Sequence, residues 1–292
     1  MKTIRVFFLL FFGMLLAACS TNLNRNAVRD DLTSAAGWSS AIVPAGNFDI
    51  AASWRQSSPP APASSSDQPE KTLFVYLEGD GLAYITPSRP SPNPTPTNPV
   101  ALRMAIADQH NDPVLYLARP CQYVMPDHGR NCARPYWTLK RYAPEIVASL
   151  DTALDLFKDK LDAQKLVLIG YSGGGALAAL LAAQRDDVAG IVTVVANLDT
   201  RFWTDRAGVS PLTGSLDPAD FAASLGQLPQ VHFSGGKDTT VGPEVTRAFM
   251  AKLPTNTPVS HITVASYDHF CCWARDWPHL STRQDLKTIP GW

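Results

Sequence analysis

The most informative stretch of the chain reads LVLIGYSGG at positions 166–174. Its four leading apolar residues predict a buried strand, and the alanine- and leucine-rich segment at 173–184 predicts a helix directly after it. Between them, GYSGG matches GxSxG, in which glycines let a strand and a helix approach closely around a serine. Such a turn exposes the hydroxyl of Ser172 at a helix N-terminus, where the helix dipole favours negative charge. A phosphate-binding loop is the alternative, but GKS, GKT and GxGxxG are all missing.

A serine hydroxyl becomes an effective nucleophile only when a neighbouring base removes its proton. In enzymes with this strand-turn-helix pattern, an acid and then a histidine follow the serine, each after a later strand. Asp238 follows the apolar run at 231–233, and His269 follows the run at 262–264. The sequence therefore predicts Ser172 as nucleophile, His269 as base and Asp238 as the acid that orients the imidazole.

Other residues compete for the same roles. Asp199 follows the strand predicted at 188–195 and is the alternative acid. Asp268 adjoins the predicted base in sequence and cannot easily reach its ring, so it is expected in a turn. His279 is the alternative base, ten residues after His269.

The negative charge that develops on a reacting carbonyl needs two backbone N–H donors, which form an oxyanion hole. The first expected donor is Gly173, directly after the serine. The second is expected from the loop after the early strand at 73–77, where the sequence EGDG occupies positions 78–81. By position, Asp80 supplies this N–H. Because a carboxylate repels an oxyanion, the side chain of Asp80 must point away or be neutralised.

Apolar runs of strand length alternate with amphipathic helical patterns along most of the chain, as in the helical stripe at 143–161. This alternation predicts an α/β fold, with helices on both faces of a mostly parallel sheet. One such domain is expected over residues 47–292. The strands at 48–54 and 73–77 are expected to pair across a linker rich in proline and serine at 57–70.

These motifs, in this order, resemble the α/β-hydrolase superfamily over roughly residues 70–275. They look most like exported bacterial lipoproteins with an EGDG oxyanion segment, in which Glu78 replaces the histidine of the usual HGxG. The resemblance implies an α/β-hydrolase fold and acyl transfer to water: an acyl-enzyme forms on Ser172, and His269 activates the water that releases it. It implies an ester or acyl substrate and no metal or organic cofactor. A carboxylic ester hydrolase is expected, and a peptidase or an acyltransferase would use the same nucleophile.

A second function class stays open. The acidic side chains of Glu78 and Asp80 are unusual in an oxyanion segment. They would suit a non-catalytic envelope lipoprotein that uses a hydrolase scaffold for binding.

Residues 1–18 have the form of a bacterial export signal, with a basic start and a short apolar run. The sequence LAAC at 16–19 resembles a lipobox, in which the thiol of Cys19 is acylated and the chain is cut just before it. An ordinary secretory peptide is the alternative. Ser20 matches the sorting preference for the outer membrane of diderm bacteria, so a lipid-anchored protein facing the periplasm is expected. Residues 19–46 are expected to form an irregular tether.

Four cysteines remain once Cys19 is acylated. An exported chain meets an oxidising compartment, so disulfides are expected, and four cysteines allow three pairings. Cys121 and Cys132 lie in one loop-like stretch and form the easiest pair. Cys271 and Cys272 would then form a bridge between neighbours or stay free, and cross-pairing of the two loops is also open. The sequence has no CxxC or HxxxH spacing for zinc.

The overall charge argues against one class of partner. Lys and Arg number 25 and Asp and Glu 26, so the formal net charge is −1. Without a basic surplus to neutralise phosphates, no nucleic-acid partner is expected. Hydrophobic residues make up 45% of the chain, which excludes disorder of the whole chain.

Two segments are candidates for the walls of the site. The segment at 202–215 follows a strand where hydrolases insert lids, and it has room only for a small lid, so an open site is expected. The proline-rich stretch at 86–99 leaves the oxyanion segment and forms either another wall or a rigid surface crossing. Arg119 is expected in a salt bridge or at the rim of the site. Trp273 and Trp277 are expected to be packing residues or an aromatic wall.

Overall fold

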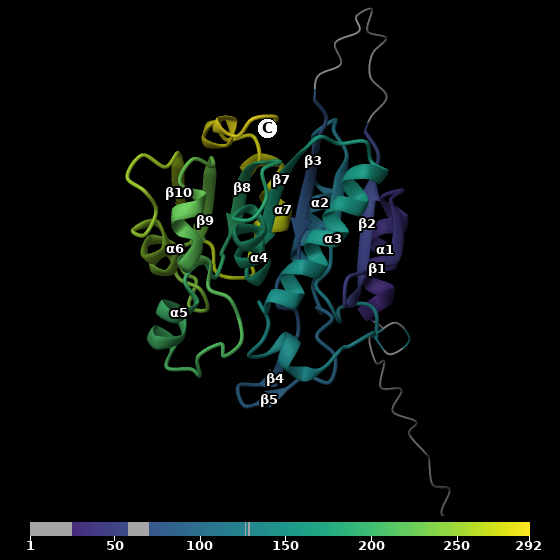
Figure 1. Ribbon diagram of the computed structural model, residues 1–292, viewed down its shortest axis with the longest axis horizontal. Helices are drawn as coiled ribbons and strands as arrows, with labels where there is room; N and C mark the ends of the chain where they lie inside the picture. The colour runs from purple at the N-terminus through teal and green to yellow at the C-terminus, as the bar shows by residue number, and fades with distance from the viewer. Residues whose placement is uncertain (1–24, 58–69, 126, 128) are drawn as a thin grey trace, which may run out of the picture.

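The computed structural model describes residues 25–57, 70–125, 127 and 129–292. At its centre lies an eight-stranded sheet in the order β1-β2-β6-β3-β7-β8-β9-β10. Strand β2 is antiparallel to both of its neighbours, and all other pairs from β6 to β10 are parallel. Helices cover both faces of this sheet (Figure 1). The predicted α/β-hydrolase architecture, a mostly parallel sheet between helices, is confirmed.

The strands of the main sheet are β1 (Ser39–Ala45), β2 (Phe48–Arg55), β3 (Thr72–Leu77), β6 (Val114–Leu117), β7 (Lys165–Tyr171), β8 (Val188–Val194), β9 (Gln230–Gly235) and β10 (Val259–Val264). A separate hairpin consists of β4 (Tyr84–Thr86) and β5 (Arg89–Pro90). The α-helices are α1 (Arg25–Ala35), α2 (Val100–Ile106), α3 (Pro144–Lys160), α4 (Gly173–Ala182), α5 (Thr200–Ala207), α6 (Pro243–Met250) and α7 (Trp273–Leu280). In the described ranges, the 3₁₀-helices are η1 (Arg134–Trp137), η2 (Pro218–Leu225) and η3 (Gln284–Thr288).

Two apolar layers join the helices to the sheet, one on each face. Leu73 and Val75 of β3 point into the layer that contains α3 and α4. Phe74 and Tyr76 point into the opposite layer, which contains α2 and α7. Successive side chains of a strand alternate between faces, so a strand covered on both sides needs an unbroken apolar run. This is why β3 is apolar at all its positions after Thr72.

The segment expected to be an irregular tether is folded over most of its length, which corrects that expectation. Residues 25–35 form α1, and residues 39–45 form β1, which pairs with β2 from Ser39 opposite Trp54 to Ala45 opposite Phe48. An edge strand buries only part of its surface, and most β1 side chains stay at least partly exposed. Its polar composition therefore resembles that of a linker. The folded part of the chain begins well before residue 47.

The expected pairing of the first two strands is also wrong. Strand β6 lies between β2 and β3, pairing antiparallel with β2 and parallel with β3. Helix α2 makes the crossover from β3 to β6, which places these two strands side by side, as βαβ connections do. Strand β2 is thereby left to pair with the outer edge of β6.

Several predictions fall on residues that the structure does not describe. Residues 1–18, Cys19 and positions 58–69 of the linker lie outside the described residues. Within the described ranges, no helix has the length and apolar character needed to cross a bilayer.

The four remaining cysteines pair locally. The sulfur atoms of Cys121 and Cys132 are 2.18 Å apart, and the two Cα atoms are 5.5 Å apart. Cys271 and Cys272 pair with each other. Of the three pairings that the sequence leaves open, the structure therefore shows the one without a bridge between the two loops.

Candidate active site

The serine of GxSxG sits on a tight turn between β7 and α4. Its backbone has a φ of +51° and a ψ of −122°, a conformation that L residues rarely adopt. The turn is held in place by its neighbours, since the N–H of Ser172 donates to the carbonyl of Val194 over 2.8 Å. A Cβ at Gly170 would lie 2.3 Å from the carbonyl oxygen of Gly174, so glycine is needed for this close approach. Ser172 is partly exposed, whereas every residue of α4, which follows it, is buried.

The three residues of the predicted triad lie together at the carboxyl ends of β7, β9 and β10. The Nε2 atom of His269 is 3.0 Å from the hydroxyl of Ser172, and its Nδ1 is 2.8 Å from Oδ2 of Asp238. The other carboxylate oxygen of Asp238 accepts the backbone N–H groups of Thr240, at 2.7 Å, and Val241, at 2.8 Å. These bonds fix the carboxylate, which in turn orients the imidazole. The arrangement can pass a proton from the serine to the imidazole.

The competing residues are engaged elsewhere. Asp199 caps α5 by accepting the N–H of Phe202 at 3.0 Å, and it forms an ion pair with Lys252. Asp268 accepts two backbone N–H groups of its own turn, as expected. His279 is exposed in the last turn of α7.

The EGDG segment lies directly against the serine turn. A Cβ at Gly79 would lie 3.3 Å from the Cβ of Ser172, and one at Gly173 would lie 2.1 Å from Oδ1 of Asp80. Among the described residues, the backbone N–H groups of Asp80 and Gly173 donate to no acceptor. Two backbone donors without a partner therefore lie in segments that adjoin the serine turn, as the predicted oxyanion hole requires.

The carboxylate of Asp80 is neutralised by two buried arginines. Arg119 forms an ion pair with one of its oxygens and Arg141 with the other. Burial alone would raise the pKa of Asp80, but Arg141 and Arg119 together hold it below its usual value. Arg119 is thus a salt-bridge residue. Arg141 was not found by sequence reasoning, because it is 61 positions from Asp80 and no motif connects them.

Glu78 is buried and connects the oxyanion segment to the elements behind it. Its Oε1 accepts the N–H of Gly79 at 3.0 Å and that of Ala101, in α2, at 3.4 Å. Its Oε2 accepts the hydroxyl of Tyr116, on β6, at 3.1 Å. Burial raises the pKa of Glu78 to about 7, although these donors oppose the shift. The residue that departs from HGxG therefore holds the loop in place.

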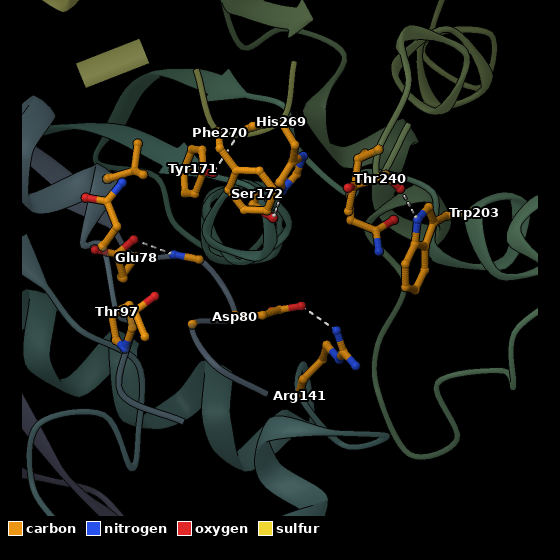
Figure 2. Close-up of a pocket in the computed structure, with 17 residues that line it drawn as sticks. Glu78, Asp80, Thr97, Arg141, Tyr171, Ser172, Trp203, Thr240, His269 and Phe270 are labelled. Atoms are coloured by element: carbon orange, nitrogen blue, oxygen red, sulfur yellow. Dashed lines mark hydrogen bonds and ion pairs between the residues drawn. The ribbon is translucent and has the colours of Figure 1, made fainter. Parts of the chain in front are cut away.

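A cavity of about 260 Å³ opens beside the serine. Figure 2 shows His269 and Phe270 on one side of Ser172, the Asp80–Arg141 pair on the opposite side, and Thr97 and Trp203 on the flanks.

The proline-rich stretch at 86–99 thus contributes a wall through Pro96, Thr97 and Asn98. Trp203, on α5, contributes another and is held by a 2.7 Å bond from its Nε1 to the carbonyl of Thr240. Trp273 and Trp277 are buried packing residues outside the cavity. Among the described residues, no three or more His, Cys, Asp or Glu side chains are grouped to hold a metal ion.

Comparison with known proteins relates both the sequence and the fold to hydrolases. The family described as alpha/beta hydrolase fold matches residues 60–213, more than half of the chain. No curated protein sequence matches the chain.

Several solved structures are similar in fold. An esterase of Pyrococcus furiosus has a TM-score of 0.58 and 13% identity, over 87% of this chain and 91% of that one. A serine hydrolase without a lid from Xanthomonas campestris has a TM-score of 0.53 and 10% identity, over 87% of this chain and 96% of that one. An acylaminoacyl peptidase of Pyrococcus horikoshii has a TM-score of 0.59 and 10% identity, over 86% of this chain and 40% of that one.

Proposed function

The chain belongs to the α/β-hydrolase fold family, and on this premise we propose that it is a serine hydrolase that cleaves carboxylic esters through an acyl-enzyme. The observation that carries the proposal is the hydrogen-bonded series from Ser172 through His269 to Asp238. The unpaired N–H groups of Asp80 and Gly173 beside the serine support it. The esterase and serine hydrolase among the similar folds agree with this choice.

In the first half of the proposed reaction, the hydroxyl oxygen of Ser172 attacks the carbonyl carbon of the ester, and its proton passes to Nε2 of His269. The carbonyl oxygen becomes an oxyanion, which accepts hydrogen bonds from the N–H groups of Asp80 and Gly173. The carbon–oxygen bond to the alcohol then breaks, and the leaving oxygen takes the proton from His269. The acyl group stays on Ser172 as an ester.

In the second half, His269 removes a proton from water as the water oxygen attacks the acyl carbon. The same N–H groups stabilise the second oxyanion. When it collapses, the bond to Ser172 breaks, the serine regains its proton from the imidazole, and a carboxylic acid leaves. Asp238 stabilises the imidazolium in both halves through its 2.8 Å bond to Nδ1.

The neutralised Asp80 favours catalysis over a purely binding role. Without a partner, the carboxylate of Asp80 would repel the negative charge of the oxyanion. That repulsion is the reason for considering a non-catalytic scaffold. The two arginines on Asp80 remove it. The site is also open enough for an ester to reach Ser172, which is partly exposed.

The test uses the fragment 20–292, a fluorophosphonate probe and intact-mass measurement. We expect one probe adduct on the folded wild type and none on Ser172→Ala, because only an activated serine attacks the phosphorus. Hydrolysis of p-nitrophenyl acetate by the wild type and not by the variant would complete the assignment. A folded fragment that neither reacts with the probe nor hydrolyses the ester would support the non-catalytic scaffold instead.

We also propose that the protein is anchored in the bacterial envelope through an acyl group on Cys19, at the outer membrane and facing the periplasm. The lipobox-like LAAC at 16–19 and Ser20 support this location. Metabolic labelling with an alkyne analogue of palmitate tests it. We expect label on the wild type and none on Cys19→Ser, and equal labelling of the two would contradict the anchor.

A further inference from the structure

A second cavity, of about 560 Å³, adjoins the cavity beside Ser172, which we call the catalytic pocket. We call the second cavity the side groove, and its apolar lining includes Tyr84, Pro90, Leu139, Val209 and Leu212. These residues come from the β4–β5 hairpin, the segment between η1 and α3, and the segment after α5.

The side groove and the catalytic pocket share two wall residues, Arg141 and Trp203. The catalytic pocket alone, at about 260 Å³, is smaller than sites for drug-sized ligands, which usually measure roughly 300–1,000 Å³. The adjoining side groove, at about 560 Å³, falls within that range. A substrate that fills only the catalytic pocket would leave the larger of the two adjoining cavities empty.

The side groove exposes apolar side chains that nothing in the described chain covers. Leu139 is 38% exposed and Val209 is 48% exposed. They are two of the six large hydrophobic residues exposed in the described part of the chain, and a third, Phe270, lines the catalytic pocket. Covering such side chains with an apolar ligand removes their surface from water, which is favourable.

The side groove suits an uncharged ligand. Apart from Arg141, no residue that lines it carries a formal charge, and Arg141 is already paired with Asp80. An acidic or basic chain would therefore lose its hydration without gaining a partner in the groove. The lining also contains Ser88, Thr138 and Ser210, whose hydroxyl groups are uncharged.

The position of the base decides which part of an ester faces the side groove. His269 protonates the leaving alcohol, so the alcohol must lie on the His269 side of Ser172. Figure 2 shows the Asp80–Arg141 pair on the opposite side of Ser172. The side groove meets the catalytic pocket at Arg141, on the side away from His269, and at Trp203, on a flank. It therefore lies toward the acyl portion of a bound ester.

We infer that the side groove binds the acyl chain of the ester, and that the substrates are esters of medium- to long-chain fatty acids. This inference rests on the proposed function, since it assigns the acyl side of the same site.

The experiment compares p-nitrophenyl acetate, butyrate and octanoate, all below their micellar concentrations and with the same leaving group. For the wild-type fragment 20–292, we expect kcat/KM to rise at least roughly tenfold from acetate to octanoate, because each buried methylene adds binding in the transition state. In Leu139→Asp, the octanoate-to-acetate ratio of kcat/KM should fall roughly tenfold. Val209→Asp is a second variant with the same expectation.

Leu156→Asp is the matched control. Leu156 lies on α3, is 39% exposed and lines neither cavity, so both rates should stay at the wild-type level. Octyl acetate and ethyl acetate share the acyl group and differ only in the alcohol, so their comparison tests the alcohol side. The ratio of their kcat/KM values should stay close to that of the wild type in both Leu139→Asp and Leu156→Asp.

Each outcome bears on the inference. Acetate hydrolysis without any gain for octanoate would overturn the inference and leave the proposed function standing. Loss of octyl acetate turnover in Leu139→Asp, with the octanoate ratio unchanged, would assign the side groove to the alcohol and also overturn it. Absence of both ester hydrolysis and fluorophosphonate labelling in the folded fragment would overturn the proposed function together with the inference.

Discussion

The ammonium group of Lys252 lies 2.6 Å from Oδ2 of Asp199. The carboxylate of Asp199 is buried, and its other oxygen caps α5 by accepting the N–H of Phe202. Its role is therefore to hold α5, the helix that carries Trp203, against the rest of the fold. The sequence makes Asp199 the alternative triad acid, but the bond to His269 comes from Asp238.

The first prediction separates the two carboxylates. Asp238→Asn should lower kcat/KM for p-nitrophenyl butyrate by roughly 10⁴-fold, because an amide no longer stabilises the imidazolium or the required tautomer. Asp199→Asn should lower it less than about threefold, since asparagine caps helices nearly as well as aspartate. Steady-state kinetics on both variants, with circular dichroism to verify folding, provide the measurement. Equal losses in the two variants would contradict the assignment of Asp238.

The second prediction concerns the carboxylate beside the oxyanion hole. Asp80→Asn leaves Arg119 and Arg141 buried without a counter-charge, so the free energy of unfolding should fall by roughly 3–5 kcal/mol. The matched change Asp220→Asn breaks the exposed ion pair with Arg201 and should cost at most about 1 kcal/mol. Urea unfolding of the two variants measures both. A small effect at Asp80 would mean that solvent screens the two arginines.

The third prediction follows from the pKa of Glu78, which burial raises to about 7. Between the ordinary glutamate value and pH 7, the folded protein keeps a proton that the unfolded chain releases. The stability contributed by this group is therefore present at low pH and is lost as pH rises through 7.

Urea unfolding of the wild type and Glu78→Gln at pH 5 and pH 8 isolates this contribution. The unfolding free energy of the wild type, relative to that of the variant, should fall by roughly 2 kcal/mol between the two pH values. The comparison with the variant removes other titrating groups, including His232, whose pKa burial lowers to about 3. A difference that does not change with pH would rule out a raised pKa.

The fourth prediction tests whether the N-terminal segment is part of the fold. A fragment of residues 47–292 lacks α1 and β1 and leaves the outer edge of β2 unpaired. Its thermal midpoint should lie at least roughly 10 °C below that of fragment 20–292, the shift that about 3 kcal/mol produces in a domain of this size. A fragment of residues 25–292 is the control and should match fragment 20–292. Equal thermal midpoints for all three fragments would indicate that residues 19–46 are a tether that does not stabilise the fold.

Sequence reasoning found what depends on local patterns and chain order. The apolar strand before GYSGG and the glycines within it define a turn with few alternatives, and the structure places Ser172 there. The order of acid and base along the chain left only a few candidates for these two roles, Asp238 or Asp199 as the acid and His269 or His279 as the base. Asp238 and His269 lie within hydrogen-bonding reach of each other because parallel strands bring successive loops to one edge of the sheet.

What sequence reasoning missed depends on contacts between distant parts of the chain. Arg141 pairs with Asp80 across 61 positions, and no local pattern marks it. The place of β6 between β2 and β3 depends on long-range strand pairing rather than on the composition of any one strand. Strand β1 has the composition of a linker because an edge strand needs few apolar side chains, so only its pairing with β2 identifies it.

Helix α1 also limits how far the catalytic pocket can stand from an anchoring bilayer. Its first residue, Arg25, donates to the carbonyl of Thr95, two positions before Thr97 in the pocket wall. Cys19 precedes Arg25 by six positions, and six residues of fully extended chain reach at most about 22 Å. With the proposed acyl group on Cys19, the catalytic pocket would therefore be held near the membrane surface. Substrates that reside in the membrane surface are within its range.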